Sequence, residues 1–249
     1  MGTASIYLLL ILAAGVASWY LAPRRWMTLL SALSHLITGL RARKTTVDGV
    51  RWYYLEGGKG KTLVILHGLA AEADHCMGVA SPLRRDFHVL VPDLPGFGKS
   101  EPPARLDFSI RDQSLRLEAW LAQLGVTECI LAGNSMGAWI AADFAARHPD
   151  RVPALWLQSP FGVLSAQPSE VLSGLEVDGS NPFSVDSMND YRNLVALMFQ
   201  RPPHLPYPIA RAGYLNARRL RNELPRMQVE VLEQSESLES LAPRLTMPV

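Results

Sequence analysis

Ser135, which lies in the stretch Gly-Asn-Ser-Met-Gly at residues 133–137, is the residue of this chain best placed to act as a nucleophile. Residues 129–132 before it are short and apolar, as in a buried parallel strand. Residues 136–148 after it are rich in alanine and suit a helix. We therefore predict a sharp strand-to-helix turn that holds the serine in a strained backbone geometry with its hydroxyl exposed above a sheet.

The glycines at both ends of this stretch, Gly133 and Gly137, have a steric reason to be there. A turn this sharp brings the strand and the helix too close together for side chains at these two positions. The first turn of the helix would also present unpaired N–H groups, and the positive end of its dipole, to an oxyanion formed near the serine. The pattern is therefore typical of a serine that attacks a carbonyl carbon.

Two further patterns precede the serine in the chain. An apolar run at residues 62–66 leads into His-Gly-Leu-Ala at residues 67–70, and a second run at 88–91 leads into Asp-Leu-Pro-Gly-Phe-Gly-Lys-Ser at residues 93–100. With the glycine-flanked serine, these patterns resemble the α/β-hydrolase superfamily in both order and spacing. The resemblance covers the chain from about residue 44 onward. It implies an α/β fold with a mostly parallel sheet, helices on both faces and a helical cap insertion.

The resemblance also implies roles for individual residues. Ser135 would attack an ester carbonyl and form an acyl-enzyme that water then releases. The backbone N–H groups of Met136 and Leu69 would hold the oxyanion. His67, together with Gly68, would order the turn and would not act as the base. The loop at 93–100 would be architectural.

The elements that must position these residues are visible in the pattern of the chain. An Asp-Gly pair at 48–49 predicts a hairpin turn, and apolar residues alternate along the strand that starts at residue 50. Helical patterns at 74–83 and 110–124 alternate with the apolar runs, and a further strand is expected at 154–157. This alternation favours a parallel sheet with helices on both faces, in a hydrolase core at residues 44–162.

The alternation of strands and helices stops after residue 162. We assign residues 163–232, with their proline-rich turns, to the cap, and residues 233–249 to an incomplete return to the core. The apolar residues of 190–199 have helical spacing, which suits either packing of the cap or the lining of an acyl-chain tunnel. The stretch at 181–208 is more loosely similar to the caps of membrane-associated bacterial lipases and mammalian monoacylglycerol lipases.

The N-terminus is expected to lie outside the globular part. Residues 6–22 carry no charge and are almost wholly apolar, and two arginines follow them, so residues 1–25 suit a single-pass membrane anchor with the catalytic part in the cytoplasm. A cleaved signal peptide and export are the alternative. Residues 26–43 follow as an interfacial or linker helix with one apolar face. A helix packed on the catalytic part is the alternative there.

The chain departs from the superfamily in its catalytic triad. Members place an Asp or Glu, and then a His, after the cap. The last histidine of this chain is His204, which lies within the cap, and residues 245–249 resemble the start of the strand that carries the acid. We therefore expect the triad Asp and His to lie beyond residue 249, in a hydrolase that is incomplete as printed.

Composition excludes several other classes of function. The net charge of +1 gives no nucleic-acid surface, and the two cysteines and six histidines show no metal-ligand spacing, so no metal or cofactor is expected. The leading hypothesis is a membrane-anchored serine hydrolase, a lipase or esterase, whose substrates are lipid or other apolar carboxylic esters. Alternatives are a capped C–C or small-ester hydrolase of the same fold, and a non-catalytic binding or scaffold protein.

Overall fold

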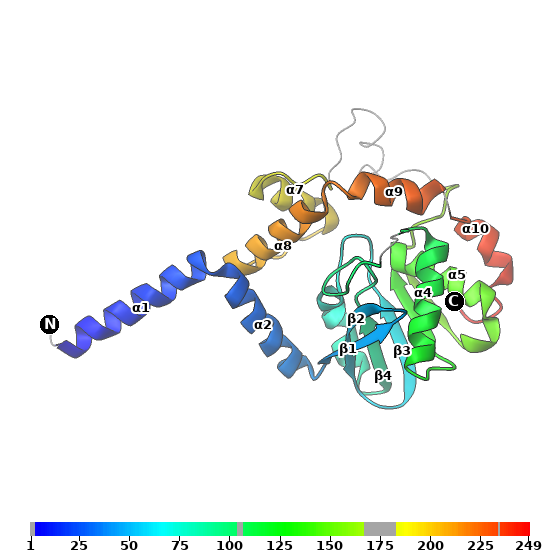
Figure 1. The fold of residues 1–249 in the computed structure, drawn as a ribbon, viewed down its shortest axis with the longest axis horizontal. Coiled ribbons are helices and arrows are strands. Elements are labelled where there is room, and N and C mark those ends of the chain that lie inside the picture. Colours follow the sequence, from blue (N-terminus) through cyan, green and yellow to red (C-terminus); the bar gives the residue numbers. More distant parts are fainter. Residues whose placement is uncertain (1–2, 104–106, 167–182, 234) are drawn as a thin grey trace. The chain divides into compact units, whose positions relative to one another are not determined.

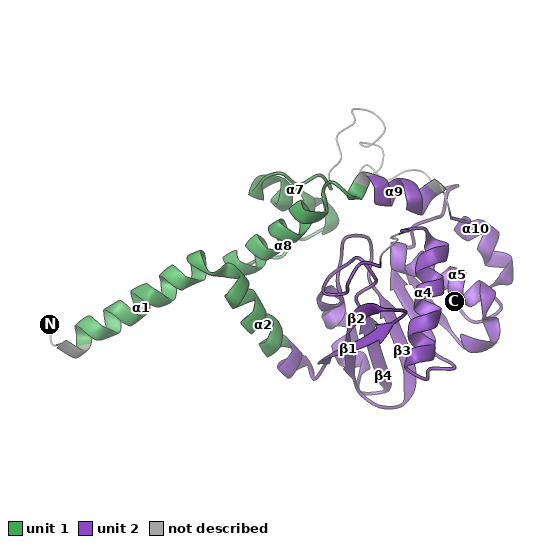
Figure 2. Cartoon of the chain, viewed as in Figure 1, with its two compact units in different colours: residues 1–34, 168–224 green, residues 35–167, 225–249 purple. Residues whose placement is uncertain are grey.

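A computed structural model of the chain describes residues 3–103, 107–166, 183–233 and 235–249. The chain divides into two compact units (Figure 2). Residues 1–34 and 168–224 form the first, which we call the helical unit, and residues 35–167 and 225–249 form the second, which we call the core unit. Ser135 belongs to the core unit.

The core unit is built on a six-stranded sheet with the order β1-β2-β4-β3-β5-β6. The first four strands are labelled in Figure 1. The strands β3 to β6 are parallel to one another, whereas β1 and β2 are antiparallel to their neighbours. This is the mostly parallel sheet that the alternating pattern predicts. The strands are β1 (Arg41–Val47), β2 (Val50–Gly57), β3 (Lys61–Leu66), β4 (Phe87–Pro92), β5 (Ile130–Asn134) and β6 (Leu155–Gln158).

The hairpin predicted at the Asp-Gly pair is present. Val47 pairs with Val50 across the turn, and the two residues between them, Asp48 and Gly49, have φ angles of 48° and 78°. Two consecutive positive φ angles are what a two-residue hairpin turn requires, which explains the residue types found there.

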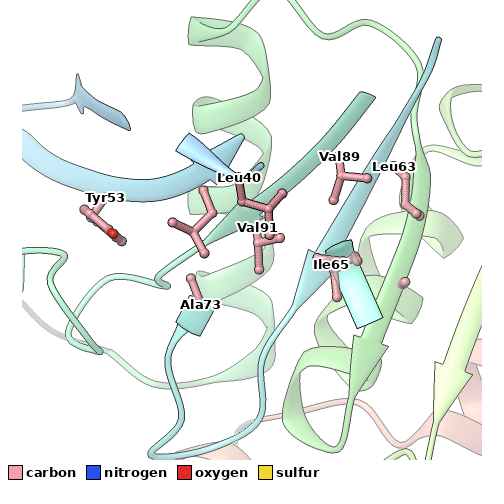
Figure 3. Close-up of a cluster of buried hydrophobic side chains, with 10 residues drawn as sticks. Leu40, Tyr53, Leu63, Ile65, Ala73, Val89 and Val91 are labelled. Carbon is pink, nitrogen blue, oxygen red and sulfur yellow. The ribbon is translucent and has the colours of Figure 1, made fainter. Parts of the chain in front are cut away.

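The side chains of β2 alternate between the two faces of the sheet, and helices pack against both faces. Trp52 and Tyr54 point to one face, where both contact the ring of Trp120 in α4. Tyr53 and Leu55 point to the other face, where they join a buried cluster with Val89, Val91 and residues of η1 and α3 (Figure 3). The predicted covering of both faces is therefore confirmed.

The helices of the core unit are mostly short. They are η1 (Ala73–Cys76), α3 (Met77–Leu83), α4 (Ile110–Gln123), α5 (Met136–Arg147), η2 (Pro149–Arg151), α10 (Leu238–Leu241) and η3 (Ala242–Arg244). The last residues return to the sheet, where the Pro248 carbonyl accepts a hydrogen bond of 2.9 Å from the N–H of Leu155 in β6.

The helical unit contains α1 (Thr3–Leu21), most of α2 (Pro23–Thr38), α7 (Met188–Met198) and α8 (Tyr207–Leu220). In α7 no described residue is buried, and Leu197 and Met198 are exposed. The apolar stripe expected around residues 190–199 is therefore only partly packed in this unit, since Tyr191 and Leu194 are half-buried and Tyr191 lies against Gly213 of α8. Phe199 already has an extended backbone at the end of the helix.

Two boundaries differ from those predicted. The linker helix assigned to 26–43 ends at Thr38, and residues 41–43 lie in β1, because Gly39 turns the chain with a φ of +67°. Residues 225–232, assigned to the cap, group with the core unit. They lie in α9 (Leu224–Glu233), where Met227 and Val231 are buried and the Glu230 carboxylate accepts from the N–H of Phe108.

Among the described residues, no single helix has both the length and the apolar character that a membrane span needs. The segment Ser5–Leu21 and α2 meet that requirement only as a pair, with a bend of 94° between them.

Candidate active site

Ser135 lies between β5 and α5, as predicted. Its φ and ψ angles are +53° and −118°, a region that residues with side chains rarely occupy. Its N–H donates to the Gln158 carbonyl at 3.1 Å, and its own carbonyl accepts from Phe161 and from the first turn of α5. The strained backbone is therefore held from both sides. No sequence pattern signalled Gln158 or Phe161, because they act through backbone groups.

The glycines around Ser135 are sterically required. A Cβ on Gly133 would lie 2.4 Å from the carbonyl group of Gly137, and a Cβ on Gly137 would lie 2.5 Å from the carbonyl oxygens of Leu66 and His67. Both distances are well below van der Waals contact, so Gly133 permits the predicted close approach of β5 and α5, and Gly137 permits a close approach of α5 to the end of β3. A Cβ on Gly68 would lie 3.4 Å from the Ser135 Cβ, which shows that the His-Gly turn runs beside the serine.

The Leu69 and Met136 N–H groups are unpaired. Within the described part of the chain, neither donates to a protein acceptor. Met136 is the first residue of α5, so its N–H has no partner inside the helix. Leu69 directly follows Gly68, in the turn beside the serine. Two free donors therefore belong to the segments next to the Ser135 side chain.

His67 is buried and both of its ring nitrogens are engaged. Nδ1 donates to the Gly68 carbonyl at 2.8 Å, and Nε2 accepts from the Leu94 N–H at 3.0 Å. Since a backbone N–H can only donate, Nε2 carries no proton. Burial lowers the pKa of His67 to about 4. His67 thus connects the turn at Gly68 to the loop at Leu94 and has no free nitrogen with which to take a proton from Ser135.

The loop at residues 93–100 is held by its own polar groups. The Asp93 carboxylate accepts from the N–H groups of Ala73 at 2.6 Å and Lys99 at 2.7 Å, and burial raises its pKa to about 7. The Ser100 hydroxyl donates to the Asp93 carbonyl at 2.7 Å and accepts from the Tyr53 N–H at 2.8 Å. These contacts support the architectural role expected for the loop.

Within the described residues, no histidine or carboxylate side chain hydrogen-bonds to the Ser135 hydroxyl. His35, His88 and His148 pair instead with carboxylates elsewhere in the chain. The described residues also contain no cluster of three His, Cys, Asp or Glu that could hold a metal ion. The site therefore consists of a strained serine, two free N–H donors and a rigid neighbouring turn.

The sequence of this chain is similar to those of known proteins. A family model described as the alpha/beta hydrolase fold matches residues 61–239. The chain is 32% identical over 193 residues to Lipase 1 of Psychrobacter immobilis, covering 76% of this chain and 59% of that lipase. It is 26% identical over 205 residues to monoacylglycerol lipase abhd6-A of Xenopus laevis, covering 77% of this chain and 61% of the relative.

A solved structure of a membrane phospholipase A, described as a bacterial virulence factor, superposes with a TM-score of 0.87 at 33% identity. That match covers 100% of this chain and 80% of the phospholipase. This chain thus spans about three-fifths of the length of the two lipases above.

Proposed function

The chain belongs to the α/β-hydrolase family and is similar to its lipases, and from this premise we propose that it hydrolyses carboxylic esters through Ser135. The observation that carries the proposal is the backbone of Ser135. A serine with a φ of +53° at the start of a helix costs free energy, and residues strained in this way cluster at active sites. Strain of this kind is typical of a nucleophile presented above a sheet.

In the proposed reaction, the Ser135 hydroxyl attacks the ester carbonyl carbon and its proton leaves to a base. The carbonyl oxygen becomes an oxyanion that the N–H groups of Leu69 and Met136 stabilise, and the alcohol then departs with a proton. Water hydrolyses the resulting acyl-enzyme and restores the serine. Loss of one such donor typically slows related enzymes by about 10²–10³.

The base is not His67. Protonation at Nε2 would break the hydrogen bond from Leu94, and a pKa of about 4 makes the ring a weak proton acceptor. Ser135 therefore has to give its proton to a base other than His67.

The substrates we propose are lipid esters or other apolar esters. Support comes from the relatives, which are named as a lipase, a monoacylglycerol lipase and a membrane phospholipase A.

Membrane attachment would bring such substrates to the site. We propose that α1 enters the bilayer, that α2 lies in the interface, and that the arginines after α1 keep the globular part on the cytoplasmic side. A protease added to right-side-out membrane vesicles tests this orientation, and we expect the globular part to be protected.

A non-catalytic binding role is the second candidate. The two candidates differ in one measurable property, the reactivity of the Ser135 hydroxyl toward an electrophile that mimics an ester.

A fluorophosphonate probe separates the two candidates. We expect protein expressed from its natural gene to be labelled at Ser135 and Ser135→Ala to be unlabelled. Ser240→Ala, which changes an exposed serine of the same unit, should be labelled like the wild type. Equal labelling of Ser135→Ala would refute the assignment of the nucleophile, and no labelling of the wild type would favour the binding role.

A further inference from the structure

The helical unit has a pocket at the bend between α1 and α2. It has a volume of about 550 Å³ and is lined by the end of α1, the start of α2 and one face of α8. Its charged residues are Arg24, Arg25 and Arg211, and no acidic residue lines it in the described part of the chain. Such a pocket favours an anion.

The three arginines are available for a ligand. Among the described residues, none of them forms an ion pair with a carboxylate, although many other arginines of the chain do. Arg24 and Arg25 are exposed, and the Arg211 guanidinium lies 4.9 Å from the centre of the Tyr214 ring, which restrains its position. Guanidinium groups bind phosphate oxygens through paired N–H donors, so three of them in one pocket suit a phosphate group.

The other walls of the pocket are aromatic and apolar. The rings of Tyr20 and Tyr207 lie 4.9 Å apart, and Leu21 completes the side nearest α1. Next to the pocket, Trp19 and Trp26 make an edge-to-face pair at 5.1 Å. Tyrosine and tryptophan gather where a bilayer meets water, at the depth of the lipid headgroups. Inorganic phosphate has no apolar part that could contact these aromatic and apolar walls.

The pocket also lies at the end of the apolar α1, which has 19 residues and a length of about 28 Å. A helix of that length reaches deep into the hydrocarbon core, although only the pair of α1 and α2 meets the length and hydropathy that a span needs. If α1 enters the bilayer, as proposed above, its last residues and the arginines of the pocket come to the level of the lipid phosphates. Two helices, α2 and α8, also begin at this pocket, and their first turns add positive potential.

We propose that this pocket binds the phosphate group of a membrane phospholipid, with the glycerol end of the lipid against Tyr20, Tyr207 and Leu21. The inference rests on the proposed membrane attachment and adds a lipid-headgroup site formed by residues other than those of the candidate active site. The bound lipid would fix the bend between α1 and α2 at the membrane surface.

Titration of the detergent-solubilised full chain with a short-chain ether phospholipid tests the proposal. We would use 1,2-di-O-hexylglycerophosphoglycerol, which has no ester to hydrolyse, in dodecyl maltoside, and measure the Kd by calorimetry. The combined change Arg24→Gln, Arg25→Gln and Arg211→Gln should raise the Kd at least about tenfold, since charge-assisted hydrogen bonds are lost. Replacement of the same three residues by lysine should raise it less.

A matched control removes three other arginines of the helical unit, through Arg192→Gln, Arg201→Gln and Arg219→Gln. These residues are exposed and do not line the pocket, so the control should change the Kd less than about twofold. An equal loss of affinity in the control, or no loss in the pocket variant, would overturn the proposal. Inorganic phosphate that binds as tightly as the lipid, with the same loss in the pocket variant, would overturn the membrane source of the ligand.

The proposed function is tested separately on the same variants. Labelling of Ser135 and sedimentation with membranes should be unchanged in the pocket variant, because neither depends on the three arginines alone. Loss of lipid binding with these two properties intact supports the pocket. Failure of the wild type to label or to sediment contradicts the proposed function, whereas the titration in detergent still reports on the pocket.

Discussion

At the scale of single residues, His67 shows how burial decides what a histidine can do. Its position before Gly68 predicts a role in ordering the turn, and the two hydrogen bonds, to the Gly68 carbonyl and from the Leu94 N–H, give that role a physical basis. The low pKa of His67 follows from its burial, since a second proton would place a charge in the interior and would also displace the Leu94 donor. A surface histidine would have kept its capacity to titrate near neutral pH.

This coupling predicts a pH-dependent stability. Below pH 6.5 the unfolded chain binds a proton at residue 67, whereas the folded chain does so only near pH 4, so the free energy of unfolding falls as the pH drops through this window. The gap from 6.5 to about 4 corresponds to at most about 3 kcal/mol. Denaturant titrations of the wild type and His67→Gln should therefore converge in stability as the pH is lowered from 7 to 4.

The comparison carries its own control at pH 8, where His67 is neutral in both states and the difference between the two proteins reflects only packing and hydrogen bonding. A stability difference that stays constant from pH 8 to pH 4 would show that His67 is protonated in the fold without cost. That outcome would also remove the low pKa as an argument against His67 as the base.

At the scale of elements, the junction of β5 and α5 depends on two glycines. Gly133→Ala or Gly137→Ala would push a methyl group to 2.4–2.5 Å from backbone atoms, and backbone cannot move aside as a flexible side chain can. We expect each change to destabilise the core unit by about 2 kcal/mol or more and to reduce fluorophosphonate labelling of Ser135. Thermal unfolding and labelling rates are the measurements.

The chain offers a matched control for this prediction. Gly78 lies in α3, and a Cβ there would meet nothing within 4 Å, so Gly78→Ala should leave the stability unchanged or raise it by about 0.5–1 kcal/mol. Wild-type stability of Gly137→Ala would mean that the helix can shift away from the His-Gly turn, contrary to the close approach described above.

Elements were predictable where hydrophobic periodicity and turn chemistry agree. The hairpin at Asp48, the strand before Ser135 and the helix after it all lie within a few residues of their predicted bounds, because each has both an apolar pattern and a terminating signal. The end of the linker helix was missed, since the apolar Leu40 continues the helical spacing. In the fold, however, Leu40 belongs to the buried cluster of the core unit.

The pocket of arginines was also missed, for a different reason. In the sequence, Arg24 and Arg25 indicate only the charged flank of an apolar segment, and Arg211 lies almost two hundred residues further along the chain. Only tertiary structure brings these residues to one cavity. By contrast, the residues around Ser135 are predictable, because a serine flanked by glycines between an apolar run and a helical run already indicates a sharp strand-to-helix turn.

At the scale of the whole molecule, the apolar surface of α1 and α2 requires an explanation. Most large apolar residues of α1 are exposed, and in α2 the exposed ones are Leu29, Leu33, Leu36 and Ile37. Exposed apolar surface of this extent is unusual for a protein in water and suits a lipid environment. Since α1 and α2 meet at a bend of 94°, an α1 that enters the bilayer would leave α2 near its plane.

This geometry predicts different contributions of the two helices to membrane attachment. Deletion of residues 3–21 should release the protein into the soluble fraction, because burial of about fifteen apolar side chains contributes far more than the interfacial helix does. Serine substitutions at Leu29, Leu33, Leu36 and Ile37 should leave attachment intact. They should, however, increase proteolysis within α2, since that helix would no longer be held at the surface. Carbonate extraction of membranes, followed by limited proteolysis, measures both effects. Release of the wild type by carbonate would show that α1 does not enter the bilayer, and a membrane-bound deletion variant would place the attachment in the globular part.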